Sequence, residues 1–348
     1  MPRISITKLI SPLSSFRCGY NRVFLRLPVS VKFRLCCAFM FATFLLHFWV
    51  PLGSQSKLKA TPESLNRIPL NVLTTANRIQ VNFGYVHLQL VNSAFVNIAL
   101  SWICNVRTLN VLERTLFVAT DVESFSALSL RAPHVELLVH ETSALSYGQT
   151  VYFQYMLFRA KLVEKLLLHG ISIWLIESDA AWFADPEPYL LKFTGMDVLV
   201  GQDGLLTDSI PEGGFIFLNS TVKTSKMWSA LRKEHEEVLE LKSELVHIGD
   251  AGSEMLMLPK HLKLVTWDFF DKQKFVSGKW YSSATMRSAS KNPIVIQNNW
   301  IVGNHAKIYR AKNWSHWFLD EVTLSCVDAN LLELQLLNAK SSNYVRFD

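Results

Sequence analysis

The chain has 348 residues and a formal net charge of +6, and 49% of its residues are hydrophobic, enough for a large core. Residues 1–34 carry seven Lys or Arg and no acid, so the rest of the chain sums to 6 − 7 = −1. A nucleic-acid-binding domain carries its positive charge on the folded body, so this charge balance argues against a nucleic-acid partner.

The basic segment is followed at residues 35–52 by LCCAFMFATFLLHFWVPL, about the length of a helix that crosses a bilayer. Because the positive charges precede it, the positive-inside rule predicts a cytosolic tail at residues 1–34 and a lumenal remainder. We expect a single-pass type II signal anchor. A cleaved signal peptide and a mitochondrial presequence remain alternatives, since both begin with a basic, acid-poor segment.

Residues 53–68 are polar and lack periodicity, which predicts a short stem before a domain at residues 69–348. Of the five cysteines, only Cys104 and Cys326 belong to this domain, so one lumenal disulfide is possible but not required.

Two sequons, at Asn219 and Asn313, are candidate glycosylation sites in the predicted lumenal domain. Two sequons occur easily by chance in a chain of this length, so they favour a secretory route only weakly.

The domain alternates between short β-rich runs and segments of helical periodicity. In chain order we expect a strand at 71–75, a helix at 86–104, strands at 115–119 and 135–139 around a helix at 121–132, and a helix at 152–168 stopped by Gly170. Strands at 171–176, 198–200, 215–218, 262–266 and 293–296 follow, with a helix at 221–245. The alternation predicts an α/β fold with a mostly parallel central sheet.

The apolar run at 171–176 ends in two carboxylates, Glu177 and Asp179. Side chains two apart on a strand point to the same side, and open α/β sheets bind ligands at the carboxyl ends of their strands. Mg²⁺ is commonly held by one or two carboxylates plus the phosphates of a substrate. The pair therefore suggests a divalent metal site, although acids at strand ends are also typical of solvated turns and helix caps.

The longer segment WLIESDAAWFADP at 174–186 resembles the metal-binding motif of the nucleotide-diphospho-sugar transferase family, whose members include the plant rhamnogalacturonan xylosyltransferases of glycosyltransferase family 77. Further similar segments follow the family's order: TTAN at 74–77, EGGFIFLNST at 212–221, FVSGKWY at 275–281 and QNNWIVGNHAKIYRAK at 297–312. The resemblance implies a GT-A-like fold, a nucleotide-sugar donor, a glycan or glycoprotein acceptor, and Mn²⁺ or Mg²⁺ as cofactor.

The resemblance also implies roles for individual residues. Metal ligands are expected at Glu177, Asp179 and Gln297, donor-binding residues at Thr74, Thr75, Asn77 and Lys307, acceptor or sugar contacts at Gly213, Gly214, Asn299 and Trp300, and catalytic residues at Arg159, Asp250 and Glu254. A cation such as Arg159 would offset charge on the leaving diphosphate, although a surface ion pair is an equally good interpretation.

The chain departs from the family pattern at demanding positions. The family usually has aspartate where Glu177 stands and often histidine where Gln297 stands, and His305 is an alternative ligand eight residues further on. In the segment 249–258, where the family has an acid followed by glutamine, this chain has neither Asp-Gln nor Glu-Gln. These changes predict weaker metal binding or slower turnover.

Together these features predict a type II Golgi membrane glycosyltransferase that transfers a hexosyl or pentosyl group from a nucleotide-diphosphate donor, with metal dependence and retention of configuration. Two alternatives remain open: a catalytically silent relative that binds glycan or nucleotide, and a soluble metal-dependent hydrolase imported into mitochondria. The donor sugar, the acceptor and the oligomeric state are not readable from the sequence.

Overall fold

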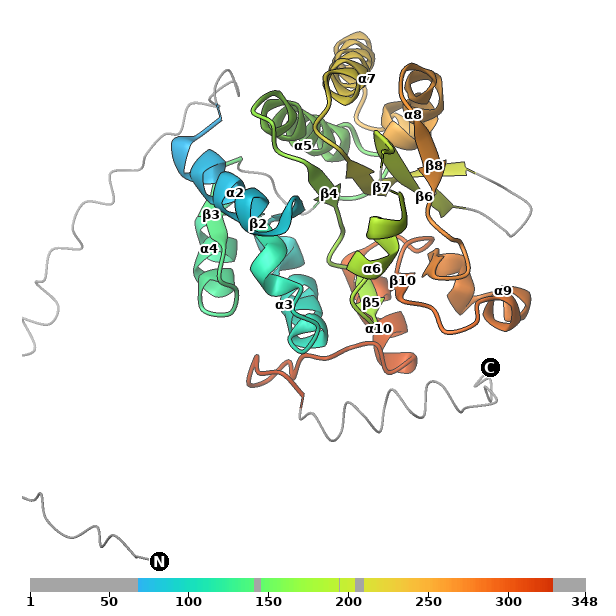
Figure 1. The fold of residues 1–348 in the computed structure, drawn as a ribbon. Coiled ribbons are helices and arrows are strands. Elements are labelled where there is room, and N and C mark those ends of the chain that lie inside the picture. The colour runs from blue at the N-terminus through green and yellow to red at the C-terminus, as the bar shows by residue number, and fades with distance from the viewer. Residues whose placement is uncertain (1–67, 141–144, 194, 204–209, 328–348) are drawn as a thin grey trace, which may run out of the picture. The chain divides into compact units, whose positions relative to one another are not determined.

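The computed structural model describes residues 68–140, 145–193, 195–203 and 210–327 (Figure 1). The predicted cytosolic tail, the predicted membrane span and nearly all of the predicted stem lie outside these residues. Among the helices that the structure describes, none combines the length and apolar composition needed to cross a bilayer.

A seven-stranded sheet forms the centre of the described domain. Its strand order is β3 (Val135–Leu137), β2 (Thr115–Ala119), β1 (Val86–Val91), β4 (Ile173–Leu175), β7 (Ile210–Leu218), β6 (Val198–Asp203) and β8 (Trp267–Phe269). Within this sheet only β7 runs against the other strands, pairing antiparallel with both β4 and β6. The predicted α/β class with a mostly parallel sheet is therefore confirmed.

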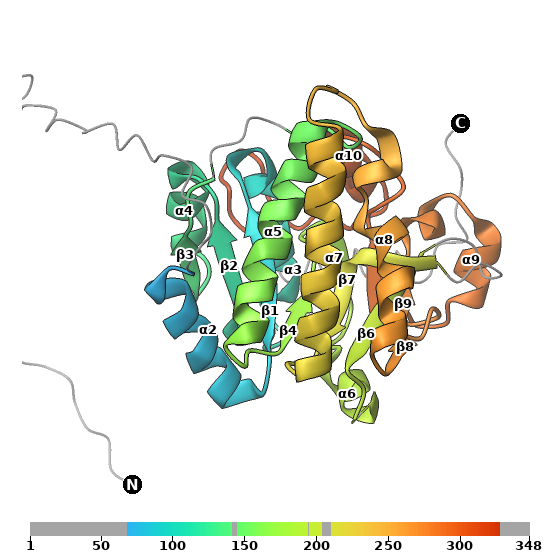
Figure 2. The same cartoon turned by 90° about the horizontal axis from the view of Figure 1, so that it is seen from above.

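Helices cover both faces of the sheet, which explains why β1 and β2 are buried along almost their whole length. One face carries α2 (Leu70–Phe83), α5 (Thr150–Leu168), α7 (Val222–Leu241) and α8 (Glu254–His261), which lie in front of the sheet in Figure 2. Their inward side chains, among them Val72, Val163, Trp228 and Leu258, form one apolar cluster with the strands.

The opposite face is covered by α3 (Val96–Val106) and α4 (Val122–Ser129) and by a second, smaller sheet. That sheet has the order β5 (Ala180–Trp182), β10 (Val295–Gln297) and β9 (Phe275–Val276). Three further helices, α6 (Glu187–Leu190), α9 (Ala284–Ala289) and α10 (Asn304–Asn313), complete the domain. Aromatic side chains fill the core here, and Trp174 stacks on Phe270 with ring centroids 5.2 Å apart.

The small sheet brings distant parts of the chain together. Because β10 is antiparallel to β5, with Gln297 opposite Ala180, the residues just before β5 meet those just after β10. The backbone N–H of Asn298 donates to the carbonyl of Asp179 at 2.6 Å. The acidic motif and the QNNW segment, more than 100 residues apart, thus share one corner of the molecule.

Two predicted elements at the start of the domain are wrong. Residues 71–75 belong to helix α2, in which Val72, Ala76 and Ile79 recur at helical spacing and are buried. Pro69 precedes this helix and Gly84, with φ of 82°, ends it, the usual placement of these two residue types.

The helix expected at 86–104 is instead β1, a short 3-10 turn at Ser93–Phe95, and α3. The strand expected at 262–266 lies slightly later, as β8, after a 3-10 turn at Leu262–Leu264. Within 86–104 the spacing of apolar residues changes from two, as in a strand, to about 3.6, as in a helix. The high apolar content of the segment makes this change hard to see.

A disulfide joins Cys104 on α3 to Cys326, which answers the question of pairing that the sequence left open. Two hydrogen bonds support this connection: Arg107 Nη2 donates to the Val327 carbonyl at 3.1 Å, and Arg131 Nη2 donates to the Leu324 carbonyl at 2.8 Å. The last described residues are therefore held against the helices on this face of the sheet.

Candidate active site

A cavity of about 380 Å³ lies beyond the carboxyl ends of β4 and β6, next to the first half of β7. Eight of the predicted site residues line it: Arg159, Glu177, Gly213, Gly214, Asp250, Asn299, Trp300 and Lys307. A smaller cavity of about 110 Å³ adjoins it, shares Arg159, Glu177 and Lys307 with it, and is also lined by Asp179. The structure thus brings together residues that are spread over nearly 150 positions of sequence.

Asp179 is the most buried acid of the motif, with 4% of its side chain exposed. Its Oδ2 accepts from Lys307 Nζ at 2.6 Å. Burial alone would lower the pKa of Lys307, but the carboxylates of Asp179 and Glu177 outweigh it and the pKa is raised. Lys307 is therefore a permanent cation beside the acidic motif.

Glu177 lies between cations and the β7 backbone. Its Oε1 is 3.4 Å from Arg159 Nη1, and Arg159 Nη2 also donates to the Gly213 carbonyl at 3.2 Å. Burial raises the pKa of Glu177, and the neighbouring Asp179 carboxylate raises it further. The positive charges of Arg159 and Lys307 act in the opposite direction and lower this pKa. A third of the Glu177 side chain remains exposed, at 35%.

Gly214 lies where β7 passes the carboxylate of Glu177. A Cβ at this position would lie 2.5 Å from the carboxyl carbon of Glu177, closer than real contacts allow. The glycine therefore leaves the space that the Glu177 carboxylate occupies.

Glu212 holds the segment after β10 in place. Its two carboxylate oxygens accept from Gln297 Nε2 at 2.5 Å and from Asn299 Nδ2 at 2.9 Å. Burial raises its pKa well above the usual range, and the nearby carboxylates of Asp203 and Glu177 add to the effect. The side chain of Gln297 is consequently buried against Glu212 and does not line either cavity that contains the acidic motif.

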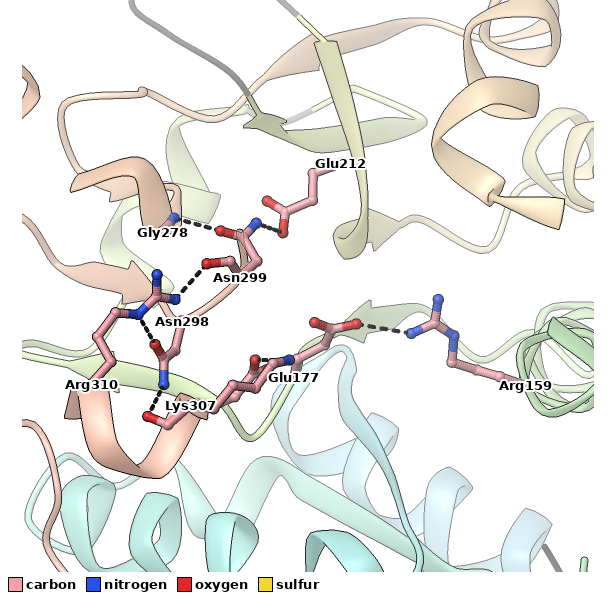
Figure 3. Close-up of polar contacts among 9 residues, drawn as sticks. Arg159, Glu177, Glu212, Gly278, Asn298, Asn299, Lys307 and Arg310 are labelled. Atoms are coloured by element: carbon pink, nitrogen blue, oxygen red, sulfur yellow. Dashed lines mark hydrogen bonds and ion pairs between the residues drawn. The ribbon is translucent and has the colours of Figure 1, made fainter. Parts of the chain in front are cut away.

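Helix α10 fixes the same segment from the other side (Figure 3). Arg310 donates to the Asn298 side chain at 2.7 Å and to the Asn299 carbonyl at 2.5 Å, and Asn298 Nδ2 donates to the Lys307 carbonyl at 2.9 Å. The backbone N–H of Gly278 donates to Asn299 Oδ1, and a Cβ there would come within 2.0 Å of the Asn299 carbonyl. The segment is therefore rigid where it borders the cavity.

The predicted catalytic acids are placed differently from each other. Asp250 lines the cavity and accepts from the Tyr147 hydroxyl at 2.6 Å, and burial together with this carboxylate raises the pKa of Tyr147 to about 12. Glu254 is the first residue of α8, and its side chain lies outside the described part of the chain.

TTAN was expected to bind the donor because it was expected at the end of a strand. These residues instead lie inside helix α2, so the structural reason for that prediction is wrong. Thr74 and Asn77 are exposed on α2, and Thr75 Oγ1 donates to Glu136 at 2.5 Å. Neither cavity at the acidic motif is lined by any of the three. TTAN holds a helix on the sheet, whereas the donor site was expected at a strand end.

Several residues that sequence reasoning missed do line these cavities. Asn92 and Phe95 follow β1, and Asn92 Oδ1 is buried with no hydrogen bond among the described residues. Asp203 ends β6 and Glu212 begins the EGGF segment. The alternation of apolar and polar residue types in VHLQL would have identified β1, and with it the polar residue at its carboxyl end.

The side chains near the acidic motif show whether a divalent metal could bind there. Among the described residues no three His, Cys, Asp or Glu side chains converge closely enough to hold a metal, and His305 is exposed on α10. Glu177 and Asp179 do present carboxylates to the same small cavity, in space that Gly214 keeps open. Two carboxylates fit a Mg²⁺ or Mn²⁺ that takes its other ligands from substrate phosphates and water.

The two sequons differ in accessibility. The Asn219 side chain is partly buried, accepting from Ser172 Oγ at 3.3 Å and donating to the Met196 carbonyl at 3.4 Å. Asn313 is exposed at the last residue of α10.

Open α/β sheets bind ligands beyond the carboxyl ends of their strands, which is where this acidic pair and its two cations lie. Residues 110–311 match the family model described as nucleotide-diphospho-sugar transferase. This match covers more than half of the chain, which therefore belongs to that family. Together with the mostly parallel sheet, family membership confirms the predicted GT-A-like fold.

Relatives of the chain include glycosyltransferases of Arabidopsis thaliana. The chain is 24% identical to the β-arabinofuranosyltransferase RAY1 over 268 residues, 70% of this chain and 49% of the relative. It is 20% identical to UDP-D-xylose:L-fucose α-1,3-D-xylosyltransferase 1 over 305 residues, 80% of this chain and 82% of the relative. The chain thus spans about half the length of the first relative and most of the second.

Solved structures of glycosyltransferases resemble the chain more distantly. Mouse xyloside xylosyltransferase 1 matches with a TM-score of 0.41 and 12% identity, covering 62% of this chain and 98% of that one. The glycosyltransferase GlyE of Streptococcus pneumoniae matches with a TM-score of 0.43 and 13% identity, covering 73% and 64%. Scores at this level add nothing to the interpretation of the site.

Proposed function

We propose that the chain is a glycosyltransferase that transfers a sugar from a nucleotide-diphosphate donor to a hydroxyl of a glycan or glycoprotein. The observation that carries this proposal is the cluster of Asp179, Lys307, Glu177 and Arg159 at the carboxyl edge of the sheet, in a chain of this family. The named activities of the relatives, xylosyl and arabinosyl transfer, favour a pentosyl donor.

The diphosphate is expected at the cationic end of the cavity. Lys307 lies near the start of α10, and Gly303 and Asn304, at the amino end of that helix, also line the cavity. A helix amino terminus offers unpaired N–H groups to an anion, and Lys307 and Arg159 add full charges. As the bond to the sugar breaks, these groups stabilise the negative charge that develops on the leaving diphosphate.

A divalent metal is part of the proposal. Glu177 and Asp179 would hold it, and when bound it would supply further charge neutralisation at the diphosphate. Among the described residues, Glu177 and Asp179 are the only two acids that line the small cavity. Two protein carboxylates leave most of the metal's ligand positions to the substrate and water, so we expect metal affinity to depend on the nucleotide. Gln297, committed to Glu212, is not included as a ligand. Retention of configuration stays a prediction.

We further propose a type II topology with residues 35–52 as the anchor and the catalytic domain in the Golgi lumen. The disulfide between Cys104 and Cys326 supports this, since disulfides persist in the oxidising secretory compartments and are rare in the cytosol. The exposed Asn313 is the expected glycosylation site, whereas the bonded side chain of Asn219 is not. A glycosidase-sensitive mass shift lost in Asn313→Gln, in a protein with an intact N-terminus, would exclude mitochondrial import.

The central test is calorimetry of UDP binding to the purified chain with and without Mn²⁺, followed by a screen of UDP-sugars for hydrolysis. We expect UDP and Mn²⁺ each to bind more tightly in the presence of the other. Binding of neither would contradict the proposal.

A catalytically silent relative is the second candidate, and the departures at Glu177 and Gln297 favour it. Such a protein would bind UDP in the same cavity but release no sugar from any donor, with or without glycan acceptors. Turnover separates the two candidates. The hydrolase alternative is abandoned, because the chain belongs to a transferase family.

A further inference from the structure

The residues that line the large cavity form two groups of different chemistry, which we call its two ends. Among its described lining residues the only Lys or Arg are Lys307 and Arg159, which belong to the diphosphate end. The other end is bordered by Asp203, Asp250 and the indole of Trp300. Binding of a diphosphate explains the first end and leaves the second without a ligand.

Trp300 is held in an unusual way for an exposed aromatic residue. Its side chain is 51% exposed, and its backbone has φ of 59°, a left-handed conformation that costs energy for any residue with a Cβ. The indole N–H donates to the Asp203 carboxylate, and Lys279 Nζ lies 3.7 Å from the ring centroid. The ring is thus fixed at one edge and over one face.

The backbone on both sides of this ring is equally constrained. Asn299, just before it, is bonded to Glu212, to Gly278 and to Arg310. A rigid aromatic face that borders a cavity is pre-organised to bind a flat, partly apolar ligand, because little entropy is lost on binding.

The surrounding polar groups narrow the class of ligand. Carboxylates such as those of Asp203 and Asp250 only accept hydrogen bonds when ionised, so they suit the hydroxyl groups of a sugar. They would repel a carboxylate or phosphate group on the same sugar, and Lys279, the cation over the Trp300 ring, is not among the described residues that line the cavity. The combination fits a neutral sugar ring.

We propose that Trp300 is the stacking platform for the acceptor sugar, held by Asp203 and Lys279, and that the acceptor is a neutral glycoside without uronate or phosphate groups. The proposal rests on the proposed function in one respect: a donor at Lys307 leaves the Trp300 end for the acceptor.

Saturation-transfer NMR on the full chain in the presence of UDP tests this directly. The probes are methyl α-L-fucoside, methyl β-D-xyloside, methyl β-D-galactoside and methyl β-D-glucuronide. We expect at least one neutral glycoside to bind, the glucuronide not to bind, and Trp300→Ala to weaken the signal at least fivefold. Trp300→Phe keeps a ring without the N–H and should keep part of the signal.

Tyr309→Ala is the matched control, because Tyr309 is 63% exposed on α10 and does not line the cavity. It should leave glycoside binding unchanged. Equal binding to wild type and Trp300→Ala, preferential binding of the glucuronide, or no binding of any neutral glycoside would each overturn the inference.

UDP calorimetry on the same preparations keeps this test separate from the proposed function. Loss of glycoside binding in Trp300→Ala with UDP binding intact supports the inference. Absence of UDP binding in the wild type contradicts the proposed function instead. If Trp300→Ala loses both UDP binding and glycoside binding while its melting temperature is unchanged, the division of the cavity into two ends is wrong.

Discussion

Two clusters of Arg or Lys with carboxylates flank strand β5, and in the described part of the chain the first of them borders a cavity. On one side Asp179 pairs with Lys307 and Glu177 with Arg159. On the other side Asp185 and Glu187 both pair with Arg114, whose side chain is 3% exposed. The sequence between Glu177 and Glu187 supplies the acids of both clusters.

The difference lies in what surrounds the charges. Arg114 is enclosed by protein, and Tyr85, whose pKa is raised mainly by its burial, lies close enough to feel its charge. Its two acids anchor the end of the motif, including the Asp-Pro step at residues 185–186. The Asp179 cluster instead faces space that a substrate can enter. Charge pairing alone therefore does not identify a functional site, and the cavity beside it does.

The sharpest test of this comparison is an isosteric change in each cluster. Asp179→Asn should lower donor turnover by about 10³-fold, because it removes a charge that holds Lys307 and a proposed metal ligand. Asp185→Asn, the matched control in the same motif, should change the turnover of folded protein less than about twofold. UDP-sugar hydrolysis measures both, and equal losses would abolish the distinction between the clusters.

The closed cluster should instead matter for stability. Arg114→Leu leaves two acids without their partner, and since both acids are about a third exposed we expect a loss of about 2 kcal/mol in the free energy of unfolding. UDP affinity of the folded fraction should stay within about twofold of wild type. Urea unfolding and calorimetry measure the two quantities, and a loss of affinity without a loss of stability would contradict the structural role.

Much of the fold was predictable because its signals are local. Buried strands at 115–119 and 198–200 and the helix ended by Gly170 follow directly from apolar periodicity and glycine placement. The start of the domain was not, because apolar residues within 86–104 also recur at helical intervals, and this concealed the polar break at Asn92 and Ser93 between strand and helix. The error placed the expected donor site at TTAN, which lies on a helix, whereas the polar residue that follows the observed strand β1 is Asn92.

The candidate site was predictable only in part for a different reason. Glu177, Asp179 and Lys307 belong to recognisable motifs, and the structure brings them together. The partners of Glu212 and Trp300 lie 85 or more positions away and depend on how β10 pairs with β5. No pattern within a short window carries that information.

Gly214 offers a smaller test within the cavity. Gly214→Ala places a methyl group where the Glu177 carboxylate now lies, so that carboxylate must move while its charge remains. We expect donor turnover to fall about tenfold, equivalent to about 1.4 kcal/mol. Glu177→Gln is the companion variant: if it is as active as wild type, the position of this carboxylate has no role in the reaction.

The smallest expected effect concerns Glu212 and is one of pH. Its pKa is raised by burial and by Asp203 and Glu177, so the folded state favours the protonated form. Its contribution to stability is then complete below the pKa of an unfolded Glu, about 4.5, and is lost as pH rises through the higher pKa of the folded state. Glu212→Gln does not titrate, and its amide oxygen still accepts from Asn299 while a flipped Gln297 amide accepts from its nitrogen. We therefore expect the melting temperature of the variant to rise relative to that of wild type between pH 5 and pH 8. The change in this difference should be equivalent to about 1 kcal/mol in the free energy of unfolding. A difference in melting temperature that is the same at both pH values would mean that Glu212 is ionised in the fold like an exposed acid, and that its contacts with Gln297 and Asn299 are those of an ordinary carboxylate.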